Sequence, residues 1–117
     1  MSKGDTSILY MQFPYGTLDL LILKTLDTMG AMHGYGIARR IEQVSESLMR
    51  LSQGSVYPAL IRLEQQGWIR TKWGLSETSR KVKFYELTRA GSAQLRLEVA
   101  NWEKAIALVA RFLVPKA

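Results

Sequence analysis

Basic side chains gather in one part of this 117-residue sequence, between positions 50 and 83. The segment holds seven lysines and arginines against two glutamates, so it carries five of the six net positive charges of the chain. This charge distribution is typical of a surface that binds phosphate groups, such as those of a nucleic acid. The basic residues are Arg50, Arg62, Arg70, Lys72, Arg80, Lys81 and Lys83.

Residues suited to catalysis or metal binding are scarce. His33 is the only histidine, there is no cysteine, and no glycine-rich phosphate loop follows a predicted strand. His33 beside Gly34 fits the start of a helix better than a general base. Glu42 and Glu46 are one helical turn apart, but carboxylates at that spacing more often form a solvated face than a metal site. The sequence therefore predicts no enzyme, no metal and no cofactor.

The elements that position the basic residues begin with two helices. Residues 18–29 are apolar on most sides, so this helix must be covered by several neighbours. Gly16 or Thr17 is its expected cap, and Gly30 ends it. A second, amphipathic helix is predicted over residues 33–48. Its buried stripe is expected to be Ile37, Ile41, Val44 and Leu48.

A third helix is predicted within QGSVYPALIRLEQQGWI, from Gln53 to Ile69, although Pro58 removes a backbone hydrogen bond there. Either Ser55 is the N-cap and Pro58 lies in the first turn, or the helix starts at Ser52 with a kink. In both cases Val56 marks the core side. The residues expected on that side are Ser52, Ala59, Leu60, Leu63 and Gly67. The residues expected to face outward are Gly54, Ser55, Pro58, Ile61, Arg62 and Gln65, and the flank between the two sides comprises Gln53, Tyr57 and Glu64.

After Gly67 the apolar period changes from helical to alternating. WIRTKW and KVKFYEL predict two antiparallel strands, joined by the turn-rich GLSETS, with a basic tip at Arg80 and Lys81. The hairpin aromatic residues are expected to pack within it rather than stack on bases. They are Trp68, Trp73, Phe84 and Tyr85.

A long final helix is predicted after Thr88, its N-cap. Apolar residues recur there at heptad spacing, and a domain this small has few other elements to cover them, so pairing with a second copy is expected. The seam comprises Leu95, Val99, Trp102, Ile106, Val109 and Leu113, widened by Ala105, Leu108 and Phe112.

Three helices, a hairpin and a further helix predict a mainly α fold with a small antiparallel β-hairpin. This is a winged helix-turn-helix plus a long C-terminal dimerisation helix, in which the third helix enters the DNA major groove. We expect an N-terminal arm (1–15), a DNA-binding domain (16–88) and the dimerisation helix (89–117). The first residues lack the apolar length of a secretory signal or membrane span, and the lack of cysteine is compatible with the cytoplasm.

Four segments resemble, in order and spacing, the PadR family of bacterial transcriptional regulators over about residues 16–100: GTLDLLILKTL, MHGYGIARRIE, QGSVYPALIRLEQQGWI and KFYELTRAGSAQL. The resemblance implies a homodimeric repressor of a pseudo-palindromic double-stranded operator, which in several members a small aromatic ligand releases. The single helix after the hairpin is similar to that of short-tailed members, whose last helix dimerises. DNA-contacting positions carried over by the resemblance are Tyr35, Gln53, Ser55, Tyr57 and Arg62, with Arg80, Lys81 and Lys83 at the wing.

Three questions stay open in the sequence. Trp102 resembles the tryptophan that stacks on planar ligands between subunits of short-tailed members, yet packing in the seam is the simpler explanation. A winged-helix module that binds a protein instead of DNA is a second function; outward Ile61 favours it, and the basic hairpin argues against it. Residues 1–15 have no assigned role, although Met11, Phe13 and Tyr15 could cover the dimer seam.

Overall fold

The computed structural model describes residue 13, residues 16–51 and residues 53–115. Its three strands form an antiparallel sheet in the order β1-β3-β2, and the fold is mainly α, as predicted. The short first strand was not expected from the sequence. The elements are α2 (Thr17–Met29), β1 (Met32–His33), α3 (Gly34–Val44), α4 (Gln53–Gln65), β2 (Ile69–Leu75), β3 (Lys81–Leu87) and α5 (Arg89–Leu113).

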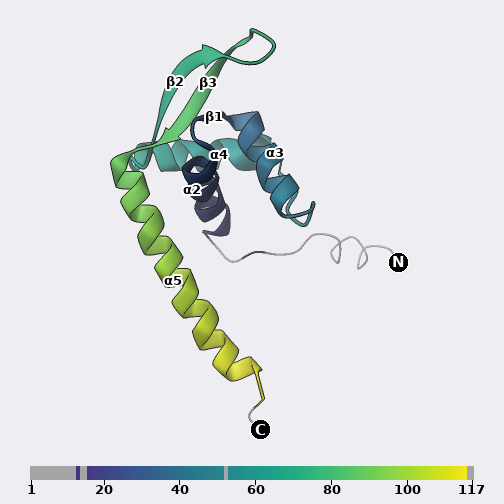
Figure 1. Cartoon of the computed structure of the whole chain (residues 1–117), viewed down its shortest axis with the longest axis vertical. Coiled ribbons are helices and arrows are strands. Elements are labelled where there is room, and N and C mark those ends of the chain that lie inside the picture. The colour runs from purple at the N-terminus through teal and green to yellow at the C-terminus, as the bar shows by residue number, and fades with distance from the viewer. Residues whose placement is uncertain (1–12, 14–15, 52, 116–117) are drawn as a thin grey trace, which may run out of the picture.

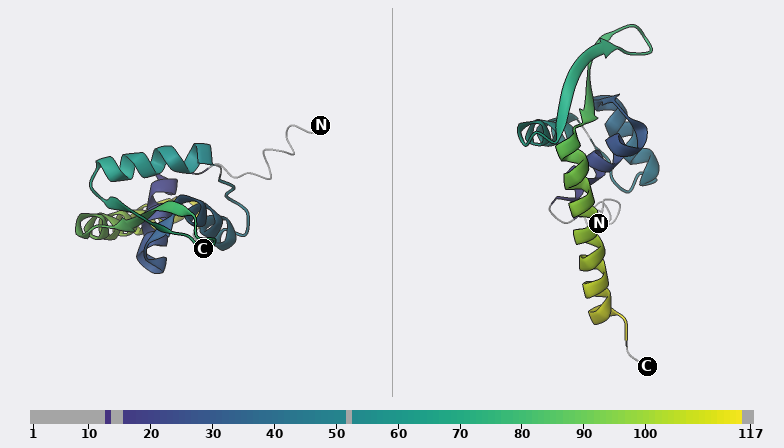
Figure 2. Two further views of the ribbon diagram at one scale, coloured as in Figure 1. Left: turned by 90° about the horizontal axis from the view of Figure 1, so that it is seen from above. Right: turned by 60° about the vertical axis from the view of Figure 1, so that its left-hand side comes forward.

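Helices α2, α3 and α4 form a body from which two elements project in opposite directions (Figure 1). The hairpin of β2 and β3, which we call the wing, rises from one end of α4. Helix α5 begins at the same corner and runs away from the wing, as both Figure 1 and the right-hand view of Figure 2 show. The molecule is therefore elongated, with extents of 58 × 41 × 21 Å.

Helix α2 lies at the centre of the body, in contact with α3, α4, β3 and α5. This position explains why it is apolar on most sides, and it confirms that several neighbours cover it. The largest fully buried side chains come from α2, α3, α4 and β2, so the core joins all parts of the body. They are Ile22, Leu23, Ile37, Val56, Leu60, Leu63 and Ile69.

Helix α3 starts as predicted and ends earlier. The Nδ1 atom of His33 accepts a hydrogen bond of 3.0 Å from the backbone N–H of Gly36, so this histidine is the N-cap. Glu46 and Ser47 adopt left-handed φ angles of 52° and 67°, which reverse the chain soon after Val44. The prediction of a buried stripe through Val44 and Leu48 is therefore wrong.

Only the first half of that stripe is buried: Leu48 lies beyond the end of the helix, and Val44, its last residue, is exposed. The exposed fractions of Val44 and Leu48 are 67% and 50%, whereas those of Ile37 and Ile41 are 0% and 4%. Met49, in the loop between α3 and α4, is buried in their place.

Helix α4 begins at Gln53, so Ser55 lies within its first turn and is not the N-cap. The alternative cap, Ser52, lies outside the described residues, as does the side chain of Gln53. Pro58 is inside the helix and has no N–H to donate to the Gly54 carbonyl. Both residues are exposed, so water or a ligand can satisfy that carbonyl.

The two sides of α4 are those predicted, with one exception. Val56, Ala59, Leu60 and Leu63 are buried, and the outward residues are exposed. Gly67 was expected on the core side but is exposed, because the helix has already ended and its φ of 78° turns the chain toward β2.

The start of α5 is anchored to the body. The Thr88 hydroxyl accepts a 2.9 Å hydrogen bond from the N–H of Gly91 and donates a 2.7 Å bond to the carbonyl of Gly67. A Cβ atom on Gly91 would lie 1.9 Å from the carbonyl oxygen of Trp68, so this position requires glycine. Thr88 is the predicted cap, while the close approach at Gly91 left no signal in the sequence.

Candidate nucleic-acid interface

The exposed residues of α4 form an outward face that carries little charge. It consists of Gly54, Ser55, Pro58, Ile61 and Arg62, with Tyr57 on its wing side. Half of the Tyr57 surface and 47% of the Ile61 surface are exposed. Glycine and proline keep the start of this face narrow, so another macromolecule can approach the helix closely.

Arg62, the cation of this face, is held by the neighbouring helix. Its Nη2 atom lies 2.7 Å from Oδ1 of Asp19, in the first turn of α2. The arginine side chain keeps 53% of its surface exposed, so the ion pair is solvated and weak. A phosphate group near Arg62 must therefore compete with Asp19.

Tyr85 connects α4 to the root of the wing. It is buried, and burial raises its pKa to about 12, with the Tyr57 hydroxyl and the Glu64 carboxylate acting in the same direction. Thr71 of β2 donates a 3.4 Å hydrogen bond to Glu64. The wing root therefore packs against the side of α4 that bears Tyr57 and Glu64.

The start of α3 adds a second exposed aromatic residue. Tyr35 has 57% of its surface exposed, and its hydroxyl accepts a 3.4 Å hydrogen bond from Nη1 of Arg39. The same guanidinium lies 5.7 Å from the centre of the Tyr35 ring. The Tyr35 hydroxyl raises the pKa of Arg39, chiefly through the hydrogen bond, so the charge of Arg39 is secure.

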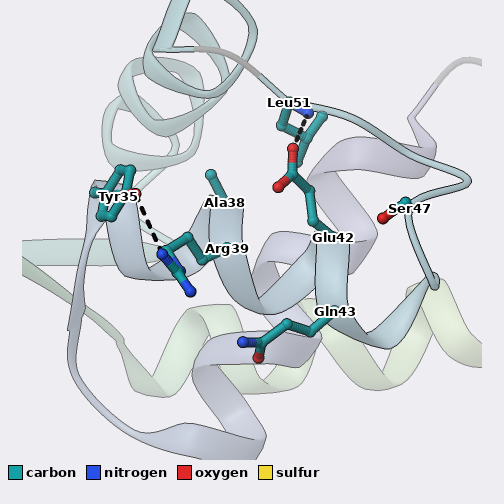
Figure 3. Close-up of a pocket in the computed structure, with 7 residues that line it drawn as sticks. All are labelled: Tyr35, Ala38, Arg39, Glu42, Gln43, Ser47 and Leu51. Atoms are coloured by element: carbon teal, nitrogen blue, oxygen red, sulfur yellow. Dashed lines mark hydrogen bonds between the residues drawn. The ribbon is translucent and has the colours of Figure 1, made fainter.

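Tyr35 and Arg39 line one end of a hollow of about 460 Å³ between α3 and the loop that leads to α4 (Figure 3). At its other end, Glu42 accepts a 3.1 Å hydrogen bond from the backbone N–H of Leu51, which fixes the approach to α4. The hollow is lined by Tyr35, Ala38, Arg39, Glu42, Gln43, Ser47 and Leu51.

The wing has an outer face on which charges are paired. Glu86 lies 2.7 Å from Nε of Arg70 and 3.4 Å from Nζ of Lys72. The hydrogen bond from Arg70 is the main cause of a lowered pKa at Glu86, and Lys72 contributes. On the same face, the ring of Phe84 packs over Gly74, where a Cβ atom would lie 2.8 Å from that ring. Two of the seven basic residues of the segment thus share a carboxylate.

The other face of the wing, which we call the helix-side face, continues from the core. The register pairs Thr71 with Tyr85, Trp73 with Lys83 and Leu75 with Lys81, so these residues share one face. Trp73 is 63% exposed, with the ammonium groups of Lys81 and Lys83 at 5.6 and 6.0 Å from its ring centre. Trp73 therefore lies against other residues of the hairpin, as expected, but most of its surface is exposed.

The predicted dimer residues differ in their surroundings along α5. Leu95 is 5% exposed within the core of its own chain, and Val99 packs against that core. Trp102 is partly buried, but beyond it the helix has left the body. Five apolar side chains there expose half or more of their surface: Ile106, Leu108, Val109, Phe112 and Leu113.

The described residues hold neither a metal site nor a membrane span. They contain no group of three histidine, cysteine, aspartate or glutamate side chains placed to share a metal ion. Within the same part of the chain, no helix combines the length and the apolar character that crossing a bilayer requires.

These elements, with α4 exposed beside a β-hairpin, define a winged-helix transcriptional regulator. A model of the transcriptional regulator PadR-like family matches residues 22–97. The chain belongs to this family, whose members bind DNA and typically dimerise.

Known structures agree with this assignment. A PadR family transcription regulator from Clostridium difficile is 30% identical, with a TM-score of 0.72 over 84% of this chain and 99% of that one. A transcriptional regulator from Clostridium thermocellum is 25% identical, with a TM-score of 0.75 over 96% and 97% of the two chains. A PadR-like transcriptional regulator from Bacillus cereus is also 25% identical, with a TM-score of 0.75 over 86% and 95%. In sequence, the chain is 26% identical to Uncharacterized protein X of Lysinibacillus sphaericus over 84% of this chain and 89% of that protein.

Proposed function

We propose that this chain is a homodimeric, sequence-specific DNA-binding repressor. The observation that supports it most is that the exposed outward face of α4 lies beside a wing whose helix-side face exposes Trp73, Leu75 and Lys81. Within the described residues, no ion pair neutralises Arg80, Lys81 or Lys83 on the wing. A surface of this kind is complementary to the phosphates that flank a major groove.

In this proposal the start of α4 enters the major groove. Gln53, Ser55 and Tyr57 reach base edges or the adjacent backbone, and Tyr35 and Arg62 contact phosphates beside them. Arg80, Lys81 and Lys83 bind the flanking backbone, which sets affinity rather than sequence preference.

The exposed end of α5 supports the homodimer. Ile106, Val109 and Leu113 lie on one side of this helix, and a second copy related by two-fold symmetry offers the same apolar side in return. The two copies of α4 then read half-sites about one helical turn, roughly 34 Å, apart.

Release by a small aromatic ligand is a further part of the proposal, centred on Trp102. Its ring is partly buried at the place where α5 leaves the body. If a planar aromatic compound stacks there, it quenches tryptophan fluorescence, and Trp102→Ala abolishes that quenching while the dimer persists. A panel of such compounds without any quenching would leave Trp102 as a packing residue.

Selection of duplexes from a random-sequence pool tests DNA reading directly. We expect enrichment of a dyad-symmetric sequence, and at least about tenfold weaker binding of that sequence by Tyr57→Ala. Gln66→Ala, just beyond the other end of α4, is the matched control and should bind as the wild type does.

Failure of the selection would favour the second candidate function. If no sequence is enriched and no duplex binds at low salt, DNA reading is wrong. A protein-binding module then explains the apolar patch of Tyr57, Pro58 and Ile61 better.

A further inference from the structure

We infer that Trp73 is a DNA-contacting residue of the wing, its indole ring lying against the sugar–phosphate backbone while Lys81 and Lys83 bind the phosphates on either side. This inference rests on the proposed DNA binding. It adds an apolar contact at a position where the sequence predicts packing, and it decides which face of the wing meets DNA.

The position of α4 indicates that the helix-side face of the wing is the one that meets DNA. The inner half of this face, with Ile69 and Tyr85, is buried against the helical body. The bond from Thr71 to Glu64 places α4 on the same side of the sheet. Trp73 follows Thr71 two residues later on the same face, where 63% of its surface is exposed. Figure 1 shows the wing beside α4, so a duplex seated on the outward face of α4 meets the wing. The register puts Trp73 on the face of the wing that lies toward α4.

The charges of the wing favour the same face. On the outer face, Arg70 and Lys72 share the carboxylate of Glu86. On the helix-side face, Lys81 and Lys83 have only the Trp73 ring as a partner among the described residues. A cation held by an exposed aromatic ring is bound weakly, so a phosphate can take both lysines from it.

The chemistry of this cluster matches a duplex backbone. Lys81 and Lys83 are two residues apart on one strand face, or about 7 Å, so they can serve two phosphates. Between them lies a flat apolar ring that is 63% exposed. Deoxyribose is the apolar part of a backbone between phosphates, and covering it removes both the ring and the sugar from water.

The experiment uses the full chain with 5-fluorotryptophan and the duplex that the wild-type chain selects from a random pool. The chain has three tryptophans and therefore gives three fluorine resonances. The resonance that is missing from Trp73→Phe belongs to Trp73. We expect the duplex to shift this resonance and shield it from solvent. Trp73→Ala should bind the duplex about tenfold more weakly with an unchanged salt dependence, because the lost contact is not ionic. Lys72→Ala, on the outer face, should change affinity by less than about threefold.

Two results would overturn the inference while DNA binding stands: a Trp73 resonance that the duplex leaves unmoved, or Trp73→Ala binding within twofold of the wild type. A loss of affinity without any response of the resonance would assign Trp73 a structural role and would count against the inference as well. A wild-type chain that selects no duplex would instead refute the proposed function, and the Trp73 contact with it.

Discussion

The body of the molecule buries its apolar side chains, whereas the far half of α5 leaves them exposed. Among the described residues, fourteen apolar side chains from the body, the root of the wing and the start of α5 form one buried cluster, which includes Ile22, Ile37, Leu60 and Ile69. In the far half of α5, apolar residues stand in solvent, and Phe112 exposes 82% of its surface. Both regions are helical and rich in leucine, isoleucine and valine, so composition does not separate them.

The difference indicates which part of the chain depends on a partner. A helix without neighbours has little stability of its own, because most helical stability in proteins comes from packing of one face. The body supplies that packing internally, whereas the far half of α5 needs it from outside the chain. The start of α5, from Thr88 to Leu95, belongs to the body and joins the two regions.

The largest expected effect comes from a charge on the far half of α5. Ile106→Asp would place a carboxylate in the proposed seam of both copies, at a cost of several kcal/mol if it is buried without a partner. We expect the dimer to dissociate to monomers at micromolar concentration, as measured by analytical ultracentrifugation. Ala107→Asp adds the same charge on the other side of the helix and should remain dimeric. Equal behaviour of the two variants would argue against this seam.

A substitution at Gly91 tests the packing of the start of α5 against the body. In Gly91→Ala the new methyl group meets the Trp68 carbonyl, so the start of α5 must move away from the body. We expect a loss of about 2 kcal/mol or more in the free energy of unfolding, measured with urea. The neighbouring Ser92→Ala is the control and should change the free energy by less than about 0.5 kcal/mol. A fully stable Gly91→Ala would mean that this contact is not tight in solution.

A smaller effect is expected from the ion pair between Asp19 and Arg62, on the surface that is proposed to face DNA. Asp19→Asn removes the carboxylate that holds Arg62, so the guanidinium is free to bind a phosphate. Affinity for the selected duplex should rise about threefold, and its dependence on salt should steepen by up to about one phosphate contact. Asp27→Asn, at the other end of α2 in an ion pair with Lys24, should leave both unchanged. If Asp19→Asn behaves like Asp27→Asn, Arg62 does not reach the DNA.

Glu86 gives the smallest expected effect. Its pKa is lowered in the folded chain, so its contribution to stability is present above the pKa of the unfolded chain. That contribution is lost as the pH falls through the folded pKa. Urea unfolding between about pH 6 and pH 3 should therefore show a less steep loss of stability for Glu86→Gln than for the wild type. Identical pH profiles would show that the ion pairs of the outer face contribute nothing measurable.

Periodicity in the sequence predicted much of the fold. The order of helices and wing, the caps at His33 and Thr88, and the buried and outward sides of α4 all follow from spacing and residue type. These features depend on residues close together in the chain. The predicted extension of the second helix to Leu48 is wrong because left-handed φ angles at Glu46 and Ser47, neither of them glycine, end the helix without a sequence signal.

The candidate interface was less predictable because pairing between distant residues determines it. The sequence shows seven basic residues in one segment, but it does not show which of them are paired. In the structure, Arg62 forms an ion pair with Asp19, 43 positions away. Arg70 and Lys72 share Glu86 across the wing. The exposure of Trp73 likewise depends on how far the wing extends past α4, which no local pattern encodes.

Salt dependence of DNA binding tests the central claim most directly. For the selected duplex, the logarithm of the dissociation constant should rise linearly with the logarithm of salt concentration. In Arg80→Ala/Lys81→Ala that slope should fall by about two phosphate contacts, because no ion pair within the described residues neutralises these cations. Binding that is indifferent to salt, or a slope that the double substitution leaves unchanged, would contradict a DNA-binding surface formed by α4 and the wing.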